Sequence, residues 1–189
     1  GWSNQLFYIG VTQVTGIVAL YSIERLERDS FLRRGLFGTL ATQGGVTRLF
    51  NRMAFSQQSG RSVRQAARER VCIGVMLLDV DHFKAYNDRY GHAAGDEVLR
   101  RVAQLMHNEA RRIDSVARYG GEEFVILTTG TDAAGLMALG ERVRGRIQQA
   151  AIENAASPHR LITISGGGAL SSAAGGGPRQ VFDLPGRCL

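Results

Sequence analysis

The residues VCIGVMLLD, positions 71–79, form an unbroken apolar run that ends in a carboxylate. Runs of this length and composition are typical of strands that are buried on both faces of a sheet. We therefore expect a central strand here, and we expect it to deliver Asp79 to one edge of that sheet.

The hydrophobic spacing around this strand predicts three helices, at 47–70, 94–111 and 132–153, and three further short strands, at 114–119, 123–128 and 161–165. Gly120-Gly121 indicates a hairpin between two of these strands, and Ser59-Gly60 indicates a break in the first helix. With one more helix between the central strand and 94–111, the element order α-β-α-α-β-β-α-β favours an α+β fold, with helices on one face of a mainly antiparallel sheet.

The N-terminal residues 1–23 contain no charged side chain, and Arg25, Arg28, Arg33 and Arg34 follow closely. About 20 such residues can cross a bilayer, and basic residues after an apolar run mark the cytoplasmic side. We expect a transmembrane helix here, with a buried core helix or a strand as the alternative. Residues 24–43 have roughly helical spacing, which indicates a juxtamembrane helix that pairs with a second copy or a plain solvated linker.

The globular domain is expected to span residues 44–165. The tail, 166–189, is rich in glycine and shows neither helical nor strand periodicity, so we expect it to be loosely ordered.

The overall composition excludes several classes of protein. The chain has 189 residues, 44% of them hydrophobic, which is too apolar for a disordered chain, and its two cysteines cannot form a disulfide framework. The net charge of +6 suits a phosphate-rich partner, such as a nucleotide, a nucleic acid or an anionic lipid. Few aromatic residues interleave with the arginines, which argues against nucleic-acid binding.

Three acidic residues are expected to meet at the sheet edge. Asp79 ends the central strand, and Glu122 and Glu123 occupy the tip of the hairpin. Clustered carboxylates repel one another unless a cation lies among them, and hard oxygen ligands favour Mg²⁺ together with substrate phosphates. Taken alone, the GGEE segment could instead be a solvated acidic turn.

The segment after the strand has the chemistry of a nucleotide site. Backbone N–H groups of residues 80–83 are free to cradle phosphate, and Lys84, the only lysine, could neutralise a triphosphate. An amide at Asn87 and a carboxylate at Asp96 can read guanine through its O6 or N3 and its N–H donors. Asp96 could equally be a favourable acid near a helix N-terminus.

Taken together, these motifs resemble the GGDEF-domain diguanylate cyclases. The resemblance covers about residues 46–165: a run similar to LTGLxNR at Val46–Arg52, DxDxFKxxND at Asp79–Asp88, GHxxGD at Gly91–Asp96, and RxGGEEF at Arg118–Phe124. It implies a βααββαβ core related to nucleotidyl cyclase and polymerase palm domains, which agrees with the predicted order.

The resemblance also implies an activity, in which two GTP molecules on facing subunits of a homodimer are joined into cyclic di-GMP and two pyrophosphates are released. Asp79, the Val80 carbonyl, Glu122 and Glu123 would hold Mg²⁺, which Mn²⁺ could replace, with Glu122 assisting deprotonation of the attacking hydroxyl. Asn87 and Asp96 would bind guanine, and His82, Phe83 and Lys84 would belong to the phosphate loop. The activity would be that of a nucleotidyltransferase, on the cytoplasmic side of the inner membrane.

A second, product-inhibition site is implied by the same resemblance. Arg111-Arg112-Ile113-Asp114 matches the family's RxxD motif, and Arg142 fits its distal arginine. Guanidinium groups bind phosphate bidentately and stack on guanine, whereas RxxD alone could be a surface salt bridge.

Two features depart from the family pattern. Gly44 and Arg48 replace the family's Asp and Gly at the start of the domain, and the tail lacks the usual terminal helix with its basic residues. The missing helix predicts weak stability and impaired catalysis. It motivates an alternative function, a non-catalytic cyclic di-GMP receptor that uses Arg111, Asp114 and Arg142.

Overall fold

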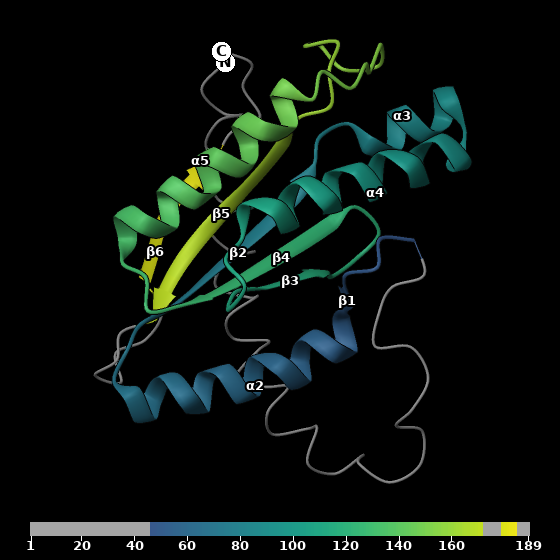
Figure 1. Ribbon diagram of the computed structural model, residues 1–189. Helices are drawn as coiled ribbons and strands as arrows, with labels where there is room; N and C mark the ends of the chain where they lie inside the picture. Colours follow the sequence, from purple (N-terminus) through teal and green to yellow (C-terminus); the bar gives the residue numbers. More distant parts are fainter. Residues whose placement is uncertain (1–45, 172–178, 185–189) are drawn as a thin grey trace, which may run out of the picture.

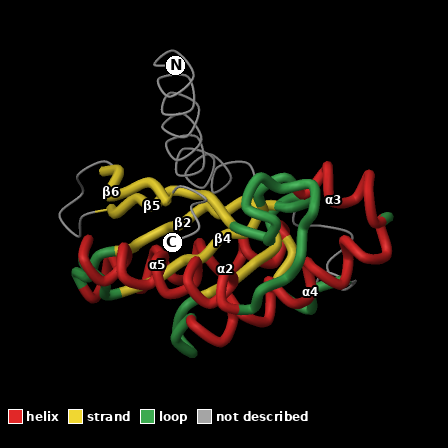
Figure 2. The backbone as a smooth tube through the Cα atoms, turned by 90° about the horizontal axis from the view of Figure 1, so that it is seen from above, coloured by secondary structure: helices red, strands yellow, loops and turns green. Residues whose placement is uncertain are grey.

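The computed structural model describes residues 46–171 and 179–184, and it folds them around one mixed sheet. In chain order the elements are β1 (Phe50–Asn51), α2 (Arg52–Glu69), β2 (Ile73–Val80), α3 (Phe83–Tyr90), α4 (His92–Glu109), β3 (Ser115–Arg118), β4 (Glu123–Thr129), α5 (Ala133–Gln149), β5 (Ile164–Ser171) and β6 (Arg179–Leu184). The six strands lie side by side in the order β1-β3-β4-β2-β5-β6, which Figure 2 shows from above.

The predicted order of elements is confirmed from α2 to β5, with β1 and β6 as strands that were not predicted, and the predicted central strand is β2. It pairs antiparallel with β4 on one side and with β5 on the other, and most of its residues are buried. The hairpin of β3 and β4 is antiparallel as well, and only the short β1 pairs in parallel, with β3.

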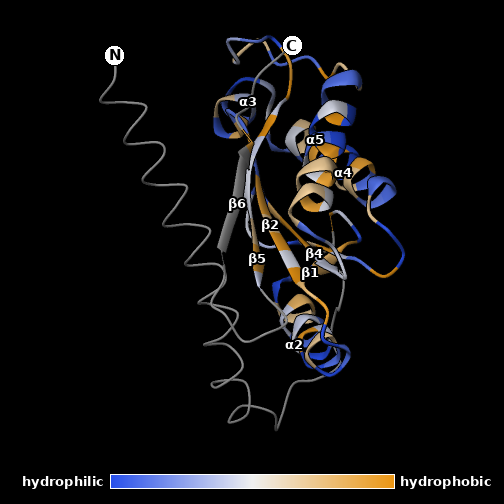
Figure 3. Cartoon of the chain, turned by 90° about the vertical axis from the view of Figure 1, so that its left-hand side faces the viewer, coloured by the Kyte–Doolittle hydropathy of each residue, from blue (hydrophilic) through white to orange (hydrophobic). Residues whose placement is uncertain are grey.

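The side chains of β2 alternate between two hydrophobic clusters. Met76 and Leu78 join the main core, to which α4 and α5 contribute, whereas Ile73 and Val75 pack with Phe55 of α2. Successive strand residues point to opposite faces, so α2 covers the face opposite to α4 and α5. The expectation that all helices share one face is therefore wrong. Figure 1 shows α4 and α5 side by side, apart from α2, and Figure 3 shows the apolar residues between sheet and helices.

The first helix is continuous, so the predicted break at Ser59-Gly60 is wrong. Both residues lie inside α2 and are buried, and the Ser59 hydroxyl donates to the Ser56 carbonyl. A glycine inside a helix costs only about 1 kcal/mol, which tertiary packing can offset. Asn51 caps the helix by accepting a hydrogen bond from the Ala54 N–H at 2.9 Å.

The tail forms strands where none was expected. β5 continues through the glycines to Ser171, and β6 pairs antiparallel with it. Leu184 at the end of β6 is only 2% exposed and belongs to the main core. The expectation of a loosely ordered tail is thus wrong for 166–171 and 179–184.

The N-terminal expectations, a transmembrane helix at 1–23 and a linker helix at 24–43, lie outside the described residues. Within the part of the chain that the structure describes, no helix is both long and apolar enough to cross a membrane.

Candidate active site

Asp79 and the hairpin acids, Glu122 and Glu123, lie at one end of the sheet. Asp79 of β2 stands directly opposite Glu123 of β4 in the antiparallel register, and the Val80 N–H donates to the Glu122 carbonyl at 3.3 Å. Directly opposed residues of a sheet share one face, so the sheet brings the carboxylates of Asp79 and Glu123 to the same side. The register therefore brings two acids from distant parts of the chain, Asp79 and Glu123, next to each other.

The glycine turn holds Glu123 and shapes the hairpin tip. Gly120 has no Cβ, and a Cβ there would collide with the carboxylate of Glu123. The Tyr119 N–H donates to the Glu123 carbonyl at 2.8 Å, and the Arg118 guanidinium donates twice to the Gly121 carbonyl, at 3.0 and 2.6 Å. These contacts fix a tight turn that places Glu122 and Glu123, both partly buried, at the sheet edge.

The electrostatics of Asp79 show how crowded these charges are. Partial burial and, to a lesser extent, the nearby negative charges of Glu122, Glu123 and Asp81 together raise its pKa from the ordinary 3.8 to about 7. Burial and like charges both disfavour the ionised carboxyl, whereas a bound cation favours it. The proton held by Asp79 is therefore in competition with any metal at this site.

The donors at this site fit a hard divalent cation. Within the described residues, no group of three or more acidic, histidine or cysteine side chains is already close enough to enclose a metal ion. Mg²⁺ does not require such a cage, because proteins usually hold it with one or two carboxylates, water and substrate phosphates. The carboxylates of Asp79 and Glu123, which face each other across β2 and β4, match that pattern.

The N-terminus of α3 lies immediately after the acids. Its capping residue, His82, is exposed, has a left-handed backbone with φ 56°, and makes no side-chain capping hydrogen bond. The first N–H groups of a helix lack partners within the helix and favour anions. Exposed Lys84 stands in the first turn.

Phe83 takes a different place from the other residues of the predicted phosphate loop. Its side chain is 5% exposed, belongs to the main core and stacks on Tyr86, with ring centroids 6.4 Å apart. Only its backbone is therefore available to a phosphate.

Asn87 and Asp96 lie at the junction of α3 and α4. The Asn87 side-chain oxygen is buried and has no hydrogen-bond partner in the structure. It occupies the space where a Cβ on Gly95 would lie, and Asp96 is the next residue in α4. An unpaired buried amide oxygen is costly, so this atom is suited to accept a hydrogen bond from a ligand.

The residues of the predicted inhibitory site are only partly brought together. Arg111 and Asp114 pair bidentately, at 3.1 and 3.0 Å, and the Arg111 guanidinium also donates to the Thr129 carbonyl. Arg142 of α5 instead lies beside Glu109, the last residue of α4, at 3.5 Å, and Glu109 also binds Arg146.

One set of site residues was not predicted from the sequence. The carboxylate of Asp81 accepts hydrogen bonds from the hydroxyls of Thr163 and Ser165, at 2.6 and 2.5 Å. An acid two positions after Asp79 and two hydroxyls alternating along a strand were the available signals, but nothing in the sequence indicates that they meet.

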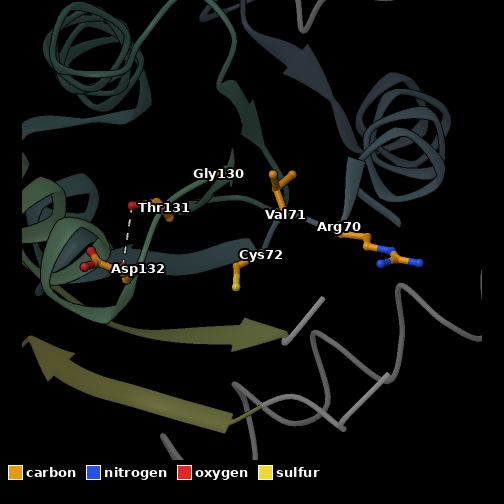
Figure 4. A pocket seen from close by; sticks show the side chains of 6 residues that line it. All are labelled: Arg70, Val71, Cys72, Gly130, Thr131 and Asp132. Atoms are coloured by element: carbon orange, nitrogen blue, oxygen red, sulfur yellow. Dashed lines mark hydrogen bonds between the residues drawn. The ribbon is translucent and has the colours of Figure 1, made fainter. Parts of the chain in front are cut away.

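A separate shallow hollow lies at the other end of β2 (Figure 4). Its volume is about 510 Å³, and it is lined by Arg70, Val71, Cys72, Gly130, Thr131 and Asp132. Cys72 is seven residues from Asp79 along an extended strand, or roughly 23 Å. This hollow is therefore distinct from the acidic site.

Comparisons with known proteins agree with this geometry. The family model "Diguanylate cyclase, GGDEF domain" matches residues 41–184, which is more than half of the chain. The chain therefore belongs to the GGDEF-domain diguanylate cyclase family.

Individual relatives show the extent of the similarity. Diguanylate cyclase DosC of Escherichia coli K12 is 34% identical over 125 residues, 66% of this chain and 27% of DosC. Response regulator PleD of Caulobacter vibrioides is 34% identical over 163 residues, 85% of this chain and 36% of PleD. The chain thus spans about a third or less of the length of these two relatives.

A solved structure matches the fold. The GGDEF domain of DgcB from Caulobacter crescentus, in complex with c-di-GMP, has a TM-score of 0.65 and 32% identity, covering 73% of this chain and 82% of that domain.

Proposed function

We propose that this chain is a diguanylate cyclase that condenses two GTP molecules into cyclic di-GMP and releases two pyrophosphates. The observation that carries the proposal is the register of Asp79 opposite Glu123, with Glu122 beside them, at the sheet end where α3 begins. The family membership of the chain supports the same reaction.

Recognition of guanine would fall to Asn87 and Asp96. The unpartnered Asn87 oxygen can accept a hydrogen bond from the guanine 2-amino group, and the Asp96 carboxylate can accept from guanine N–H donors. Adenine offers no matching pair of donors, so these residues would select GTP over ATP.

Binding of the triphosphate would use the start of α3. The N–H groups after His82 and the ammonium group of Lys84 would receive phosphate oxygens, because free helix N–H groups and a point positive charge both favour anions.

The acids would hold a divalent cation and move one proton. Asp79, the Val80 carbonyl, Glu122 and Glu123 would hold Mg²⁺, or Mn²⁺ in its place, and the bound metal would supply compensation for the charge on the phosphoryl oxygens. Glu122 would accept the proton of the 3′-hydroxyl as that oxygen attacks the α-phosphorus of the second GTP.

Two subunits are required by this reaction. Each would bind one GTP, so the two ribose–phosphate groups can react only when two copies of the chain face each other. Residues 1–23 would anchor the protein in the inner membrane with the catalytic domain in the cytoplasm.

Product inhibition would act through Arg111, Asp114 and Arg142. Solved relatives such as the DgcB domain contain c-di-GMP, which supports a binding role for this family. Both arginines are exposed, and Arg142 engages Glu109, so cyclic di-GMP would compete with the Glu109 carboxylate for the Arg142 guanidinium.

The alternative function is a cyclic di-GMP receptor without turnover. The Arg111–Asp114 pair is formed, with the Arg111 side chain half exposed, and it favours this alternative because it does not depend on the metal site.

Incubation with GTP and Mg²⁺, followed by chromatography, distinguishes the two functions. A cyclase forms cyclic di-GMP, and Glu122→Gln abolishes the product while the protein stays folded. Absence of turnover together with cyclic di-GMP binding that is lost in Arg111→Ala would establish the receptor and overturn the cyclase proposal.

A further inference from the structure

The carboxylate of Asp81 links the end of β2 to the start of β5. Its two oxygens accept from two different hydroxyls, Oδ2 from Thr163 at 2.6 Å and Oδ1 from Ser165 at 2.5 Å. The backbone N–H of Asp81 also donates to the Thr163 carbonyl at 3.0 Å. Three hydrogen bonds therefore join this one residue to Thr163, directly before β5, and to Ser165 in β5.

These contacts determine where the Val80 carbonyl points. The Val80 carbonyl and the Asp81 N–H belong to one planar trans peptide, in which the two groups point in opposite directions. Because the N–H is directed toward Thr163 on the β5 side, the carbonyl is directed toward the β4 side. The Val80 N–H points to that side as well, since it donates to the Glu122 carbonyl at 3.3 Å.

We infer that Asp81, together with Thr163 and Ser165, is a positioning device that aims the Val80 carbonyl at the metal between Asp79 and the hairpin acids. This inference rests on the proposed cyclase function, because that function assigns the metal to this site. Asp81 itself is not a ligand of that metal, since both of its oxygens are turned to the hydroxyls of the opposite strand.

The chemistry of the three side chains suits this role. A hydrogen bond from a hydroxyl to a carboxylate is charge-assisted and short, so it restrains a peptide more firmly than a neutral contact does. Thr163 is 3% exposed, which shields these hydrogen bonds from competing water. Residues that orient metal ligands in this way typically change metal affinity by about 10- to 100-fold when they are removed.

The experiment measures Mn²⁺ binding by electron paramagnetic resonance, in the presence of a saturating, non-reactive GTP analogue. The double variant Thr163→Val/Ser165→Ala should weaken Mn²⁺ binding by about 10-fold or more. Binding of the analogue without metal should be unchanged, because guanine and phosphate contacts are not altered. The single variant Thr163→Ser keeps the hydroxyl, so its Mn²⁺ affinity should equal that of the unaltered protein.

A matched control separates positioning from general loss of stability. Thr128 is a buried threonine at the far end of β4, where its hydroxyl donates to the Gly74 carbonyl at 3.3 Å. Thr128→Val makes the same chemical change away from the acids and should leave Mn²⁺ affinity unaltered. If the double variant does not fold, Ser165→Ala alone provides the comparison.

The outcomes are distinct. Unchanged Mn²⁺ affinity in a folded hydroxyl variant would overturn the positioning role alone. Loss of Mn²⁺ binding in Asp81→Asn with normal binding in the hydroxyl variants would identify Asp81 as a ligand and also overturn it. Absence of Mn²⁺ binding by the unaltered protein with the GTP analogue would overturn the proposed cyclase function, and this inference with it.

Discussion

Asp79 is the residue whose chemistry depends most on its surroundings. Burial, together with Glu122, Glu123 and Asp81, raises its pKa to about 7, so the folded protein binds this proton more tightly than the unfolded chain does. For an acid with a raised pKa, the stability contributed by the proton is lost as the pH rises from the ordinary value toward the folded one. Without metal, Asp79 should therefore destabilise the fold increasingly between about pH 4 and pH 7.

The prediction is that Asp79→Asn stabilises the metal-free protein at about pH 8 and that most of this advantage is gone at about pH 5. Urea unfolding of both proteins in a chelator, at the two pH values, measures the difference. Equal stabilisation at both pH values would contradict the raised pKa. In the same pH range, Mn²⁺ affinity of the unaltered protein should increase as the proton is released.

Arg48 occupies a backbone conformation that favours glycine. Its φ is 59°, and its side chain is exposed, at the position where the family motif has glycine. A left-handed conformation costs a residue with a Cβ roughly 1–2 kcal/mol. Arg48→Gly should thus raise the free energy of unfolding by about 1 kcal/mol.

Denaturant unfolding of Arg48→Gly, with Arg48→Ala as the control, tests this. The alanine variant keeps the strain and should show no gain. Equal stability of the glycine variant and the unaltered protein would mean that the strain is absent.

At the scale of elements, the junction of α3 and α4 connects packing with nucleotide recognition. A Cβ on Gly95 would collide with the Asn87 side-chain oxygen, whereas Gly145, inside α5, has open space around it. Helix propensity alone would favour alanine over glycine at both positions by about 1 kcal/mol.

Gly95→Ala should accordingly lower GTP affinity and stability, because Asn87 must move, while Gly145→Ala should raise stability by about 0.5–1 kcal/mol. Isothermal titration with GTP and thermal unfolding measure both effects. A Gly95→Ala protein that binds GTP normally would show that Asn87 does not need its present position.

Elements with a strong side-chain pattern could be predicted from the sequence. The local sequence alone indicates the apolar strand β2, the amphipathic helix α4 and the hairpin around Gly120. The pairing of β2 with β4 then brings Asp79 opposite Glu123. β5 could not be predicted in full, because Gly166–Gly168 carry no side-chain alternation and are held by backbone pairing to β2 and β6.

Contacts between elements that are far apart along the chain could not be predicted from the sequence either. Helix α2 lies on its side of the sheet because its Phe55 packs against Ile73 and Val75 of β2. The hydrogen bonds of Asp81 form only because β5 lies beside β2. The unpaired oxygen of Asn87 depends in the same way on the approach of α4 to α3.

For the molecule as a whole, β6 forms the edge strand of the sheet next to β5. Leu184 is 2% exposed in the core shared by β2, α4 and α5, so the tail contributes to stability. Leu184→Ala should cost about 2–5 kcal/mol of unfolding free energy, as is usual for a buried leucine. Met137→Ala, at an exposed methionine of α5, serves as control and should have little effect.

Urea unfolding of the two variants measures the contribution of the tail. A Leu184→Ala protein as stable as the Met137→Ala protein would mean that residues 179–184 do not pack on the sheet. The expectation of weak stability, which the atypical sequence of residues 166–189 suggests, stays a prediction that the same unfolding curves will test.

The most direct measurement of the central claim is the yield of cyclic di-GMP and pyrophosphate from GTP and Mg²⁺, compared between the unaltered chain and Asp79→Asn. If Asp79 and the hairpin acids act on the same metal-bound GTP, the unaltered chain releases two pyrophosphates for each cyclic di-GMP, and Asp79→Asn forms neither. Cyclic di-GMP formation at an undiminished rate by a folded Asp79→Asn protein would contradict it.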